Sequence, residues 1–517
     1  MKKISKKGIS LIVLIITIVV IIILAAVVIL TLTKNNPIES AKEAALKEDI
    51  RAYQDELNMY ISKEYQQTQG KRDSKITATG YEKDITSQEY NNSVYKYLSG
   101  FKKKYENKIA IKDDRIAYVG NDLKERNILQ NLNVYMSKLI TVKYVNEDGE
   151  ELKPREYIST FDGKYMIDSP EIEGYLPALT NIIGEVTTDS EVLVEYCTEC
   201  GDLAYIGLDS EGNETDVDSN IVAYTVAGIG SCKNKNIVIP RTHNSKPVIK
   251  IKEKAFNGNK TIKNLIIQDN ITNIESNALN NISNLKNIKI NAENISNISG
   301  GAEVLELGES VKEVSSIGYN NLKTLIINSN NINLTAQKFI STSSKNFKNI
   351  IVNEGNTKFK VEDNVLYSKD GKILYLYPSG KEGKYEFPSS VEKIVNRAFI
   401  NNTYINEIYI PETVKVINTY LFQGCTNLHY VTINAANIPG DIFNNSRSQK
   451  KLCFGTNVKS IGTGGSLYPD PNSVECEYFG TMEEWNKINK GKNWYKAWGG
   501  VKVISSVKCT DGVINLE

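Results

Sequence analysis

The chain has 517 residues, with 62 basic and 61 acidic side chains and a formal net charge of +1. That balance argues against a nucleic-acid-binding protein, whose domain would be visibly basic, and seven cysteines over this length do not make a disulfide-rich scaffold. The length predicts three or four domains of roughly 100–200 residues each, and an apolar content of 41% is enough to build their cores.

The N-terminus begins with a short leader, residues 1–8, which contains four lysines. Residues 9–32 carry no charged side chain. At about 1.5 Å per helical residue they reach about 36 Å, which is enough to cross a hydrocarbon core of about 30 Å. A secretory signal peptide would have an apolar stretch of only about 7–15 residues with a small-residue cleavage site after it. The pattern therefore predicts a transmembrane helix whose basic end stays in the cytoplasm, so that the rest of the chain lies outside.

After Pro37 the pattern becomes amphipathic, with apolar residues at steps of three and four or multiples of them. We therefore expect a helix over residues 9–66, with a bend near Pro37 because proline lacks an amide hydrogen. The residues predicted for its buried face are Ile38, Ala41, Ala45, Tyr53, Leu57 and Tyr60.

This N-terminal segment, LysLysGly followed by IleSerLeuIleValLeuIleIle and an amphipathic extension, resembles a type IV prepilin over roughly residues 3–66. The resemblance implies cleavage between Gly8 and Ile9 by a prepilin peptidase, and a helix that can pass from the membrane into a filament core. The family usually carries Glu at the fifth mature position, where this chain has Val13. Three interpretations stay open: a tip or minor pilin subunit, a protein that remains in the membrane, and a plain anchor without processing.

Residues 67–137 are expected to form a small α+β domain packed on that helix, as in the head of a pilin-like subunit. Two short alternating runs flank Asp113 and Asp114 and predict a β-hairpin. Residues 123–134 predict a short helix or a coiled exit.

Residues 138–197 predict a small β-rich domain, with strands at 140–145 and 191–196 and a turn at 146–149. The strand opening, the AspGly turn, a central GluGlyTyr and a closing ValXValXTyr resemble a MucBP-like repeat. That resemblance implies a ubiquitin-like module of bacterial surface proteins, acting either as a spacer or as a glycan binder. The tyrosines that could stack on sugars, although aromatic side chains in small domains more often fill the core, are Tyr144, Tyr165, Tyr175 and Tyr196.

Cys197 and Cys200 have the spacing of a metal knuckle. A zinc site needs four ligands, and no second pair follows; Cys232 is a distant single. We expect no metal centre here, and a local disulfide or two free thiols instead. Residues 198–247 are predicted to be a linker with two strand-like runs that lead into the repeats, and we expect the fragment after Cys200 to fold alone.

Residues 248–475 repeat a unit in which Val-x-x-Ile, an AlaPhe pair and Leu-x-x-Ile-x-Ile follow one another. A period in the twenties predicts a solenoid, because a unit that cannot bury its own apolar face must stack on its neighbours. Residues 294–350 depart from the pattern, although the stretch after Leu322 keeps a strand. Clear copies start near Val248, Ile271, Val391 and Val414, and the side chains expected to plug their turns are Phe256, Leu279, Phe399 and Phe422.

The unit resembles the BspA-type leucine-rich repeat, a resemblance that spans roughly residues 220–517. An inserted hairpin segment within 353–380 and a terminal segment containing Trp485 and Trp494 support it. Residues 476–517 would then cap the solenoid. Thr481 and Glu484 form a capping-box pair, which predicts a helix beginning at Met482.

The predicted fold is thus multidomain: a long N-terminal α-helix, a pilin-like α+β head, a β-rich module and a leucine-rich-repeat solenoid with a helical cap. The chain has two histidines, His243 and His429, and no nucleotide, protease or hydrolase motif in a supporting context, so we expect neither an enzyme nor a cofactor.

The resemblances imply an adhesin-like, membrane-anchored or pilus-associated protein whose repeats contact a host or neighbouring-cell protein or glycan. Its other expected partners are the membrane, a prepilin peptidase and other pilin subunits. The alternative is a structural stalk or minor pilin without an outside ligand. An exposed aromatic patch on one face would favour the adhesin, and a uniformly polar surface would favour the stalk.

Overall fold

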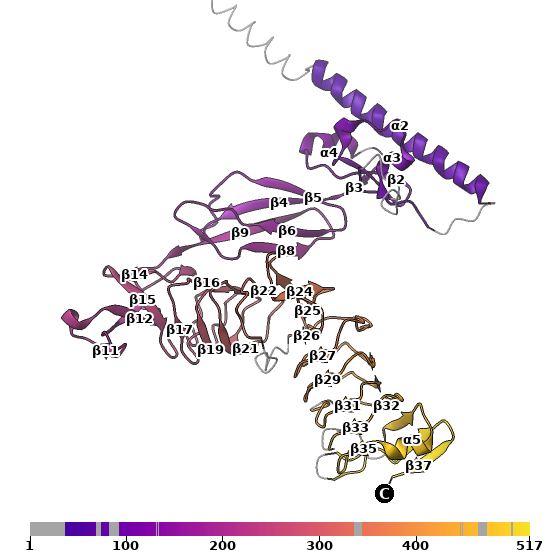
Figure 1. Ribbon diagram of the computed structural model, residues 1–517. Coiled ribbons are helices and arrows are strands. Elements are labelled where there is room, and N and C mark those ends of the chain that lie inside the picture. The colour runs from indigo at the N-terminus through magenta and orange to yellow at the C-terminus, as the bar shows by residue number, and fades with distance from the viewer. Residues whose placement is uncertain are drawn as a thin grey trace, which may run out of the picture. The chain divides into compact units, whose positions relative to one another are not determined.

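The computed structural model describes residues 37–68, 74–81, 92–130, 132, 134–334, 344–444, 446, 448–463, 473–497 and 500–516. The predicted leader and apolar span, with Gly8, Ile9 and Val13, lie outside these residues. Among the helices that the structure describes, none combines the length and apolar character needed to cross a bilayer. Figure 1 labels the helices and strands along the chain. The chain divides into two units: Met1–Lys143 with Lys153–Ile167 and Ile182–Leu193, and Tyr144–Leu152 with Asp168–Asn181 and Val194–Glu517.

The first unit is built on helix α2 (Pro37–Gln67), which buries a stripe of side chains against the rest of the domain. Tyr53 and Leu57 are buried as predicted, but Ala41 and Ala45 are exposed. Leu46 and Ile50 complete the stripe instead, because these larger side chains remove far more apolar surface from water than alanine does.

The structure confirms the predicted β-hairpin, which packs against α2. Strands β1 (Ile109–Lys112) and β2 (Arg115–Tyr118) pair antiparallel around Asp113 and Asp114, both in the left-handed region that such two-residue turns require. Gln54 fastens the hairpin to α2, because its amide accepts from the Ile116 N–H at 2.9 Å and donates to the Asp114 carbonyl. The other elements of this domain are α3 (Val94–Tyr97), η2 (Lys103–Tyr105), α4 (Leu123–Leu129) and β3 (Tyr135–Met136).

A buried guanidinium joins α4 to the strand that follows it. Arg126 donates to the Gly120 carbonyl at 3.0 Å, to the Ser137 hydroxyl at 3.2 Å and to the Ser137 carbonyl. The predicted strands of the next module are confirmed. They are β4 (Lys138–Val145) and β9 (Ser190–Glu199), and between them in the chain come β5 (Glu156–Thr160), β6 (Lys164–Asp168), β7 (Leu176–Pro177) and β8 (Asn181–Glu185).

The first block of repeats stacks one parallel strand per repeat into a continuous sheet, as the Leu-x-Ile pattern predicts. Its strands are β13 (Asn236–Val238), β16 (Asn264–Ile267), β18 (Asn287–Ile290), β20 (Val304–Leu307), β22 (Thr324–Ile327) and β23 (Asn349–Val352). Strand β20 lies in the stretch that departs from the sequence pattern, and it pairs in register with β18 and β22. Its inward side chains, Leu305 and Leu307, are fully buried.

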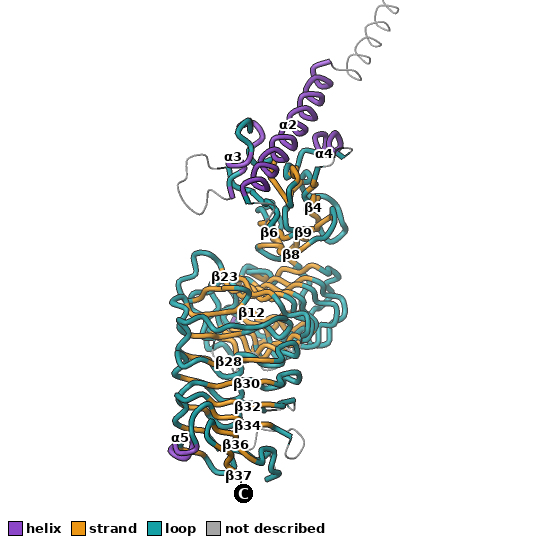
Figure 2. The backbone as a smooth tube through the Cα atoms, turned by 90° about the vertical axis from the view of Figure 1, so that its right-hand side faces the viewer, coloured by secondary structure: helices purple, strands orange, loops and turns teal. Residues whose placement is uncertain are grey.

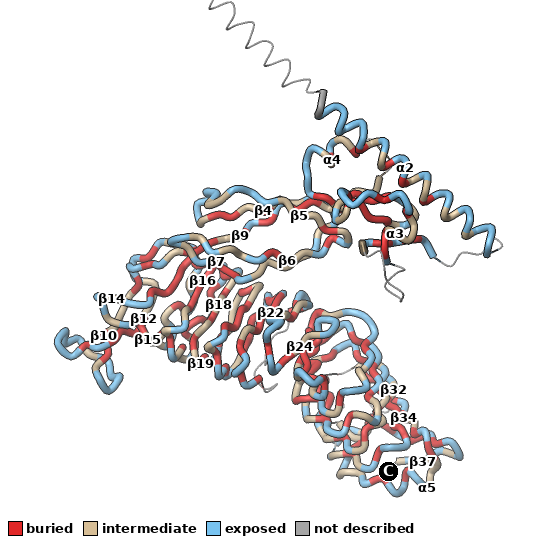
Figure 3. The backbone as a smooth tube through the Cα atoms, turned by 45° about the horizontal axis from the view of Figure 1, so that its top comes forward, coloured by how far each residue is buried: buried red, intermediate tan, exposed pale blue. Residues whose placement is uncertain are grey.

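A second sheet closes the other side of this block, and the apolar core lies between the two. Figure 3 shows the buried residues along these strands in red. The strands are β10 (Ala204–Leu208), β11 (Glu214–Thr215), β12 (Ala223–Gly228), β14 (Thr242–His243), β15 (Lys246–Ile251), β17 (Asn273–Ile274), β19 (Asn294–Gly300) and β21 (Glu313–Tyr319), with η3 (Asp218–Asn220) between β11 and β12.

An asparagine ladder runs along the start of three consecutive strands of the first sheet. The Asn264 amide donates to the Asn236 side-chain carbonyl at 2.8 Å, and the Asn287 amide donates to Asn264 at the same distance. The buried Asn264 side chain thus both donates to and accepts from a neighbouring amide, which is what a buried polar group requires.

We expect Asn264→Ala to destabilise the chain by about 1–3 kcal/mol, because it leaves both neighbouring amides with an unmade hydrogen bond. The measurement is the urea midpoint followed by far-ultraviolet circular dichroism. Asn294→Ala, at an exposed strand start on the other sheet, is the matched control and should leave the midpoint nearly unchanged. Equal shifts for the two variants would contradict the ladder's role.

The second block follows the inserted hairpin, which is confirmed: β24 (Phe359–Glu362), β25 (Val365–Ser368) and β26 (Ile373–Leu376) pair antiparallel in turn. Figure 2 shows the strands of its main sheet one below another. They are β28 (Glu407–Ile410), β30 (Tyr430–Ile433), β32 (Lys451–Phe454), β34 (Glu475–Tyr478), β36 (Ser506–Cys509) and β37 (Gly512–Asn515). Short strands form the other side: β27 (Lys393–Ile394), β29 (Val416–Ile417), β31 (Asn437–Ile438), β33 (Ser460–Ile461) and β35 (Asn489–Lys490).

Two local predictions for the repeats are confirmed. The four predicted plugs, Phe256, Leu279, Phe399 and Phe422, are all buried. Helix α5 (Met482–Lys487) begins at the predicted residue, with the Thr481 and Glu484 side chains each accepting from the other residue's backbone amide.

Candidate binding surface

The main sheet of the second block has one side chain row inside and one outside, because successive residues of a strand point to opposite faces. We call the outward side chains of β28, β30, β32, β34, β36 and β37, together with Phe479 directly after β34, the outer face. Parallel register sets Glu407, Tyr430, Lys451 and Glu475 in one row across the strands. A second row holds Tyr409, Thr432, Cys453, Glu477, Lys508 and Val513.

Large apolar and aromatic side chains are exposed on this face. Tyr409 is 49% exposed, Tyr430 45% and Val513 57%, and Phe479, just after β34, is 47% exposed. After Tyr409 its row continues with the small residues Thr432 and Cys453, and Cys453 is buried beside the Lys451–Glu477 ion pair. A Cβ atom at Gly455 would lie 2.0 Å from the side-chain oxygen Oδ1 of Asn434, so the Asn434 side chain packs directly against this glycine.

Charged groups on and beside the face are held in place by their neighbours. The Glu412 carboxylate accepts from the Asn434 amide at 3.0 Å and from the Tyr409 hydroxyl at 3.4 Å. The pKa of the Glu412 carboxyl is lowered first by a hydrogen bond from its own backbone amide and then by the hydrogen bond from Asn434. Lys451 lies 2.6 Å from Glu477 and lowers the pKa of the glutamate, while the glutamate raises the pKa of the lysine. Both groups therefore stay ionised at neutral pH.

The equivalent face of the first block is covered. Ile266, the third residue of β16 as Tyr409 is of β28, is only 3% exposed and packs with Ala178, Cys197 and Val238. Residues 168–181 belong to the same unit and cover part of this face, where Ala178 packs with Ile266 and the Thr180 amide donates to Glu306. The outer face of the second block has no such cover among the described residues.

A buried carboxylate holds that covering segment down. Glu306, with no exposed side-chain surface, accepts from the Thr180 N–H at 2.8 Å and from the Asn328 amide at 3.0 Å. Lys289 lies 3.3 Å from Glu306 and donates to the Thr180 hydroxyl at 2.7 Å. Nearby, Leu176, Pro177, Arg241 and Asp269 line a cavity of about 180 Å³.

The cysteine expectation needs correction. Cys200 forms a disulfide with Cys232 rather than with Cys197, which is buried as a free thiol. Burial raises the pKa of the Cys197 thiol. The residues that the structure describes contain no group of three or more His, Cys, Asp or Glu placed to hold a metal ion.

The fragment expected to fold alone would also lose part of its unit. Cys200 and residues 144–152 and 168–181 belong to the same unit as the repeats. A chain that begins after Cys200 therefore lacks the disulfide and uncovers Ile266.

The remaining predicted site residues divide between core and surface. Tyr144 and Tyr196 are buried, and the Tyr196 hydroxyl donates to the Pro170 carbonyl at 2.6 Å, whereas Tyr165 and Tyr175 are half-buried. His429 is half-buried in the turn before β30.

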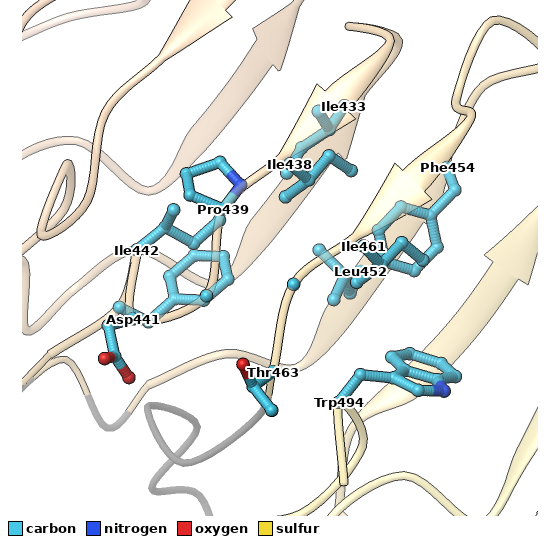
Figure 4. A pocket seen from close by; sticks show the side chains of 13 residues that line it. Ile433, Ile438, Pro439, Asp441, Ile442, Leu452, Phe454, Ile461, Thr463 and Trp494 are labelled. Carbon is cyan, nitrogen blue, oxygen red and sulfur yellow. The ribbon is translucent and has the colours of Figure 1, made fainter. Parts of the chain in front are cut away.

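A second, smaller cavity of about 40 Å³ lies between successive repeats of the second block (Figure 4). Apolar side chains such as Ile438, Phe454 and Trp494 line it, with Asp441 and Thr463 at one side. A space of this size holds about one water molecule, so it is a packing gap rather than a ligand site.

Sequence reasoning missed Tyr409 and Tyr430, although a signal for them was present. Both occupy outward positions of strands whose inward residues are isoleucine and valine. The corresponding outward positions of β18 are Asn287 and Lys289, so the aromatic residues depart from the polar pattern.

Comparison with known families agrees with this architecture. Residues 228–368 and 379–465 match the BspA type leucine rich repeat region, in six copies. The matched residues, just under half of the chain, are similar to that repeat region. Strands β28 and β30, which carry the two tyrosines of the outer face, lie in the second matched range.

Three solved structures resemble the repeat region at low identity. The pneumococcal vaccine antigen PcpA is 18% identical, with 57% of this chain and 96% of that chain covered and a TM-score of 0.34. A leucine-rich repeat protein from Eubacterium ventriosum is 15% identical, with 56% and 88% covered and a TM-score of 0.31. A leucine rich cell surface protein from Faecalibacterium prausnitzii is 18% identical, with 56% and 96% covered and a TM-score of 0.26. No curated protein matches the chain. The prepilin-like and MucBP-like resemblances stay predictions.

Proposed function

We propose that this chain is a bacterial surface protein that binds a macromolecule through the outer face of its BspA-type repeats. The observation that carries the proposal is the group of exposed side chains on one face of one sheet: Tyr409, Tyr430, Phe479 and Val513. Aromatic side chains are enriched in protein interfaces and dominate their binding energy. A structural stalk needs no such group, and would be served by a uniformly polar face.

The N-terminal segment supplies the attachment in this proposal. The apolar stretch 9–32 would hold the chain in the membrane, or carry it into a filament tip after cleavage between Gly8 and Ile9. N-terminal sequencing of the mature protein, from membranes and from sheared filaments, distinguishes the two. A start at Ile9 supports processing by a prepilin peptidase, and an intact Met1 leaves a plain anchor.

The binding proposal is tested with the full chain, purified in detergent and coupled to beads. Arrays of extracellular matrix proteins, mucins and oligosaccharides serve as targets. The triple variant Tyr409→Ser, Tyr430→Ser and Phe479→Ser should lose at least about tenfold in adhesion, the equivalent of about 1.4 kcal/mol.

The matched control changes three other exposed apolar residues, Met166→Ser, Val217→Ser and Val222→Ser. It should adhere like the unaltered chain. If the outer-face variant binds as well as the control, this face is not the contact surface. If no target is bound by any form, the stalk interpretation replaces the proposal.

A further inference from the structure

We infer that the outer face binds an extended basic polypeptide, with an arginine or lysine side chain held between Tyr409 and Tyr430 against Glu407. This inference rests on the proposed function and names the chemistry of the partner. The three side chains lie at the β28 edge of the sheet.

Glu407 lies beside both tyrosines. It is in direct register with Tyr430 on the adjacent strand, and neighbouring strands are about 4.8 Å apart. It also shares the outward side of β28 with Tyr409, two residues along, a separation of roughly 6.6 Å. A carboxylate is thus set among two exposed rings, and both kinds of group attract a cation: the rings through their faces within about 6 Å, and the carboxylate by charge-assisted hydrogen bonds.

The Glu407 carboxylate is available for this contact. It has no ion-pair partner among the described residues. Lys384 is a nearby cation whose charge interacts with it, but that ammonium group is already paired with Glu386 at 2.9 Å. A cation from a partner would therefore give Glu407 the direct ion pair that no described residue makes with it.

The charge of the whole surface has the same sign. The outer face holds three carboxylates and two ammonium groups, a net charge of −1, from Glu407, Glu475 and Glu477 against Lys451 and Lys508. Glu412 adjoins the face as a further carboxylate, and the adjoining Lys384 is paired with Glu386. Lys451 is neutralised by Glu477. The chain as a whole is at +1, so this face is acidic on a nearly neutral protein and complements a basic partner.

The form of the surface suits an extended segment. The small residues Thr432 and Cys453 follow Tyr409 in its row across the strands, and the Lys451–Glu477 ion pair lies beside them. An extended chain can therefore cross several strands from the tyrosine rings toward these charged groups. An uncharged oligosaccharide would also stack on tyrosine, but it would leave the excess negative charge unmatched. A basic polypeptide satisfies the rings and the carboxylates together.

The test uses the full chain in detergent and fluorescein-labelled peptides of twelve residues that alternate glycine with arginine, lysine, serine or glutamate. Fluorescence anisotropy gives the affinities at low and physiological salt. We expect the arginine and lysine peptides to bind, the serine and glutamate peptides not to bind, and the affinity of the basic peptides to fall as salt screens the charges.

Glu407→Gln should weaken binding of the arginine peptide about tenfold, the effect of one charge-assisted contact. The double variant Tyr409→Ser and Tyr430→Ser should weaken it at least as much. The matched control is Glu309→Gln, an exposed carboxylate elsewhere in the repeats, which should leave the affinity unchanged.

Equal binding by Glu407→Gln and the unaltered chain would overturn the inference, as would equal binding of the serine and arginine peptides. If the bead assay shows adhesion that depends on the outer face while the basic peptides do not bind, the proposed function stands and the basic partner is wrong. An oligosaccharide hit unaffected by Glu407→Gln, or concentration-dependent self-association that the tyrosine variants abolish, would put a glycan or a second copy in its place.

Discussion

Replacing Phe399 by alanine should lower the free energy of unfolding of the second repeat block by about 3–5 kcal/mol. This is the largest effect we expect from a single substitution in this chain. The ring is completely buried and lies at the centre of an aromatic cluster. Its centroid is 4.9 Å from that of Tyr377, 5.5 Å from Phe422 and 5.6 Å from Tyr385. Removing it leaves a cavity that stacked repeats on both sides prevent from closing.

The measurement is urea unfolding followed by tryptophan fluorescence. Trp485 and Trp494 belong to the same hydrophobic cluster as Phe399, so their emission reports on this block. Phe479→Ala is the matched control: the same side chain is removed from a position that is 47% exposed, and the shift should stay below about 0.5 kcal/mol. If Phe399→Ala also lowered the free energy of unfolding by less than about 0.5 kcal/mol, the buried side chains that plug the turns would not be what stabilises the block.

Loss of the Cys200–Cys232 disulfide should lower the free energy of unfolding by about 3–4 kcal/mol. The two cysteines are 32 residues apart, and the entropy removed from an unfolded loop of that length gives this magnitude. Both belong to the apolar core of the first block, so the bond fixes the strand entering the repeats to the turn after β12. In Cys200→Ala with Cys232→Ala, the urea midpoint measured by circular dichroism should fall to that of the reduced unaltered chain.

Reductant provides the internal control. Dithiothreitol should lower the midpoint of the unaltered chain and of Cys197→Ala, and should not move the double variant, because Cys197 is outside the bond. An unaltered chain that keeps its midpoint after thiol titration confirms reduction would contradict the disulfide's stabilising role.

Local sequence patterns predicted the repeat strands, the hairpin around Asp113 and Asp114 and the start of α5, because each depends on neighbours in the chain. The sequence pattern did not predict strand β20, because its repeat is shorter than the others. Leu305 and Leu307 nevertheless fill the same inward positions. The pairing of Cys200 with Cys232 depends on where the chain returns to itself, with the two Cα atoms 6.2 Å apart. The spacing of the cysteines along the chain does not predict that distance.

The exposure of the outer face also depends on segments that are distant in the sequence. Alternation within a strand predicts that Ile266 and Tyr409 both point outward from the solenoid. Whether an outward position meets solvent depends on distant segments, and residues 168–181 cover Ile266 while Tyr409 stays open. Sequence can therefore identify the two sides of a repeat sheet, and the three-dimensional arrangement identifies which side is free to bind.

Chemical labelling of tyrosines on the full chain tests most directly whether the outer face is the contact surface. Tyr409, Tyr430 and Tyr65 are 49%, 45% and 46% exposed, so a tyrosine-nitrating reagent read out by mass spectrometry should modify all three at similar rates in the free protein. When the chain is bound to the target found on the arrays, we expect Tyr409 and Tyr430 to be protected at least about fivefold, since contact residues at an interface lose their access to solvent, while Tyr65 reacts as before. Unchanged labelling of Tyr409 and Tyr430 in the bound state would contradict the account.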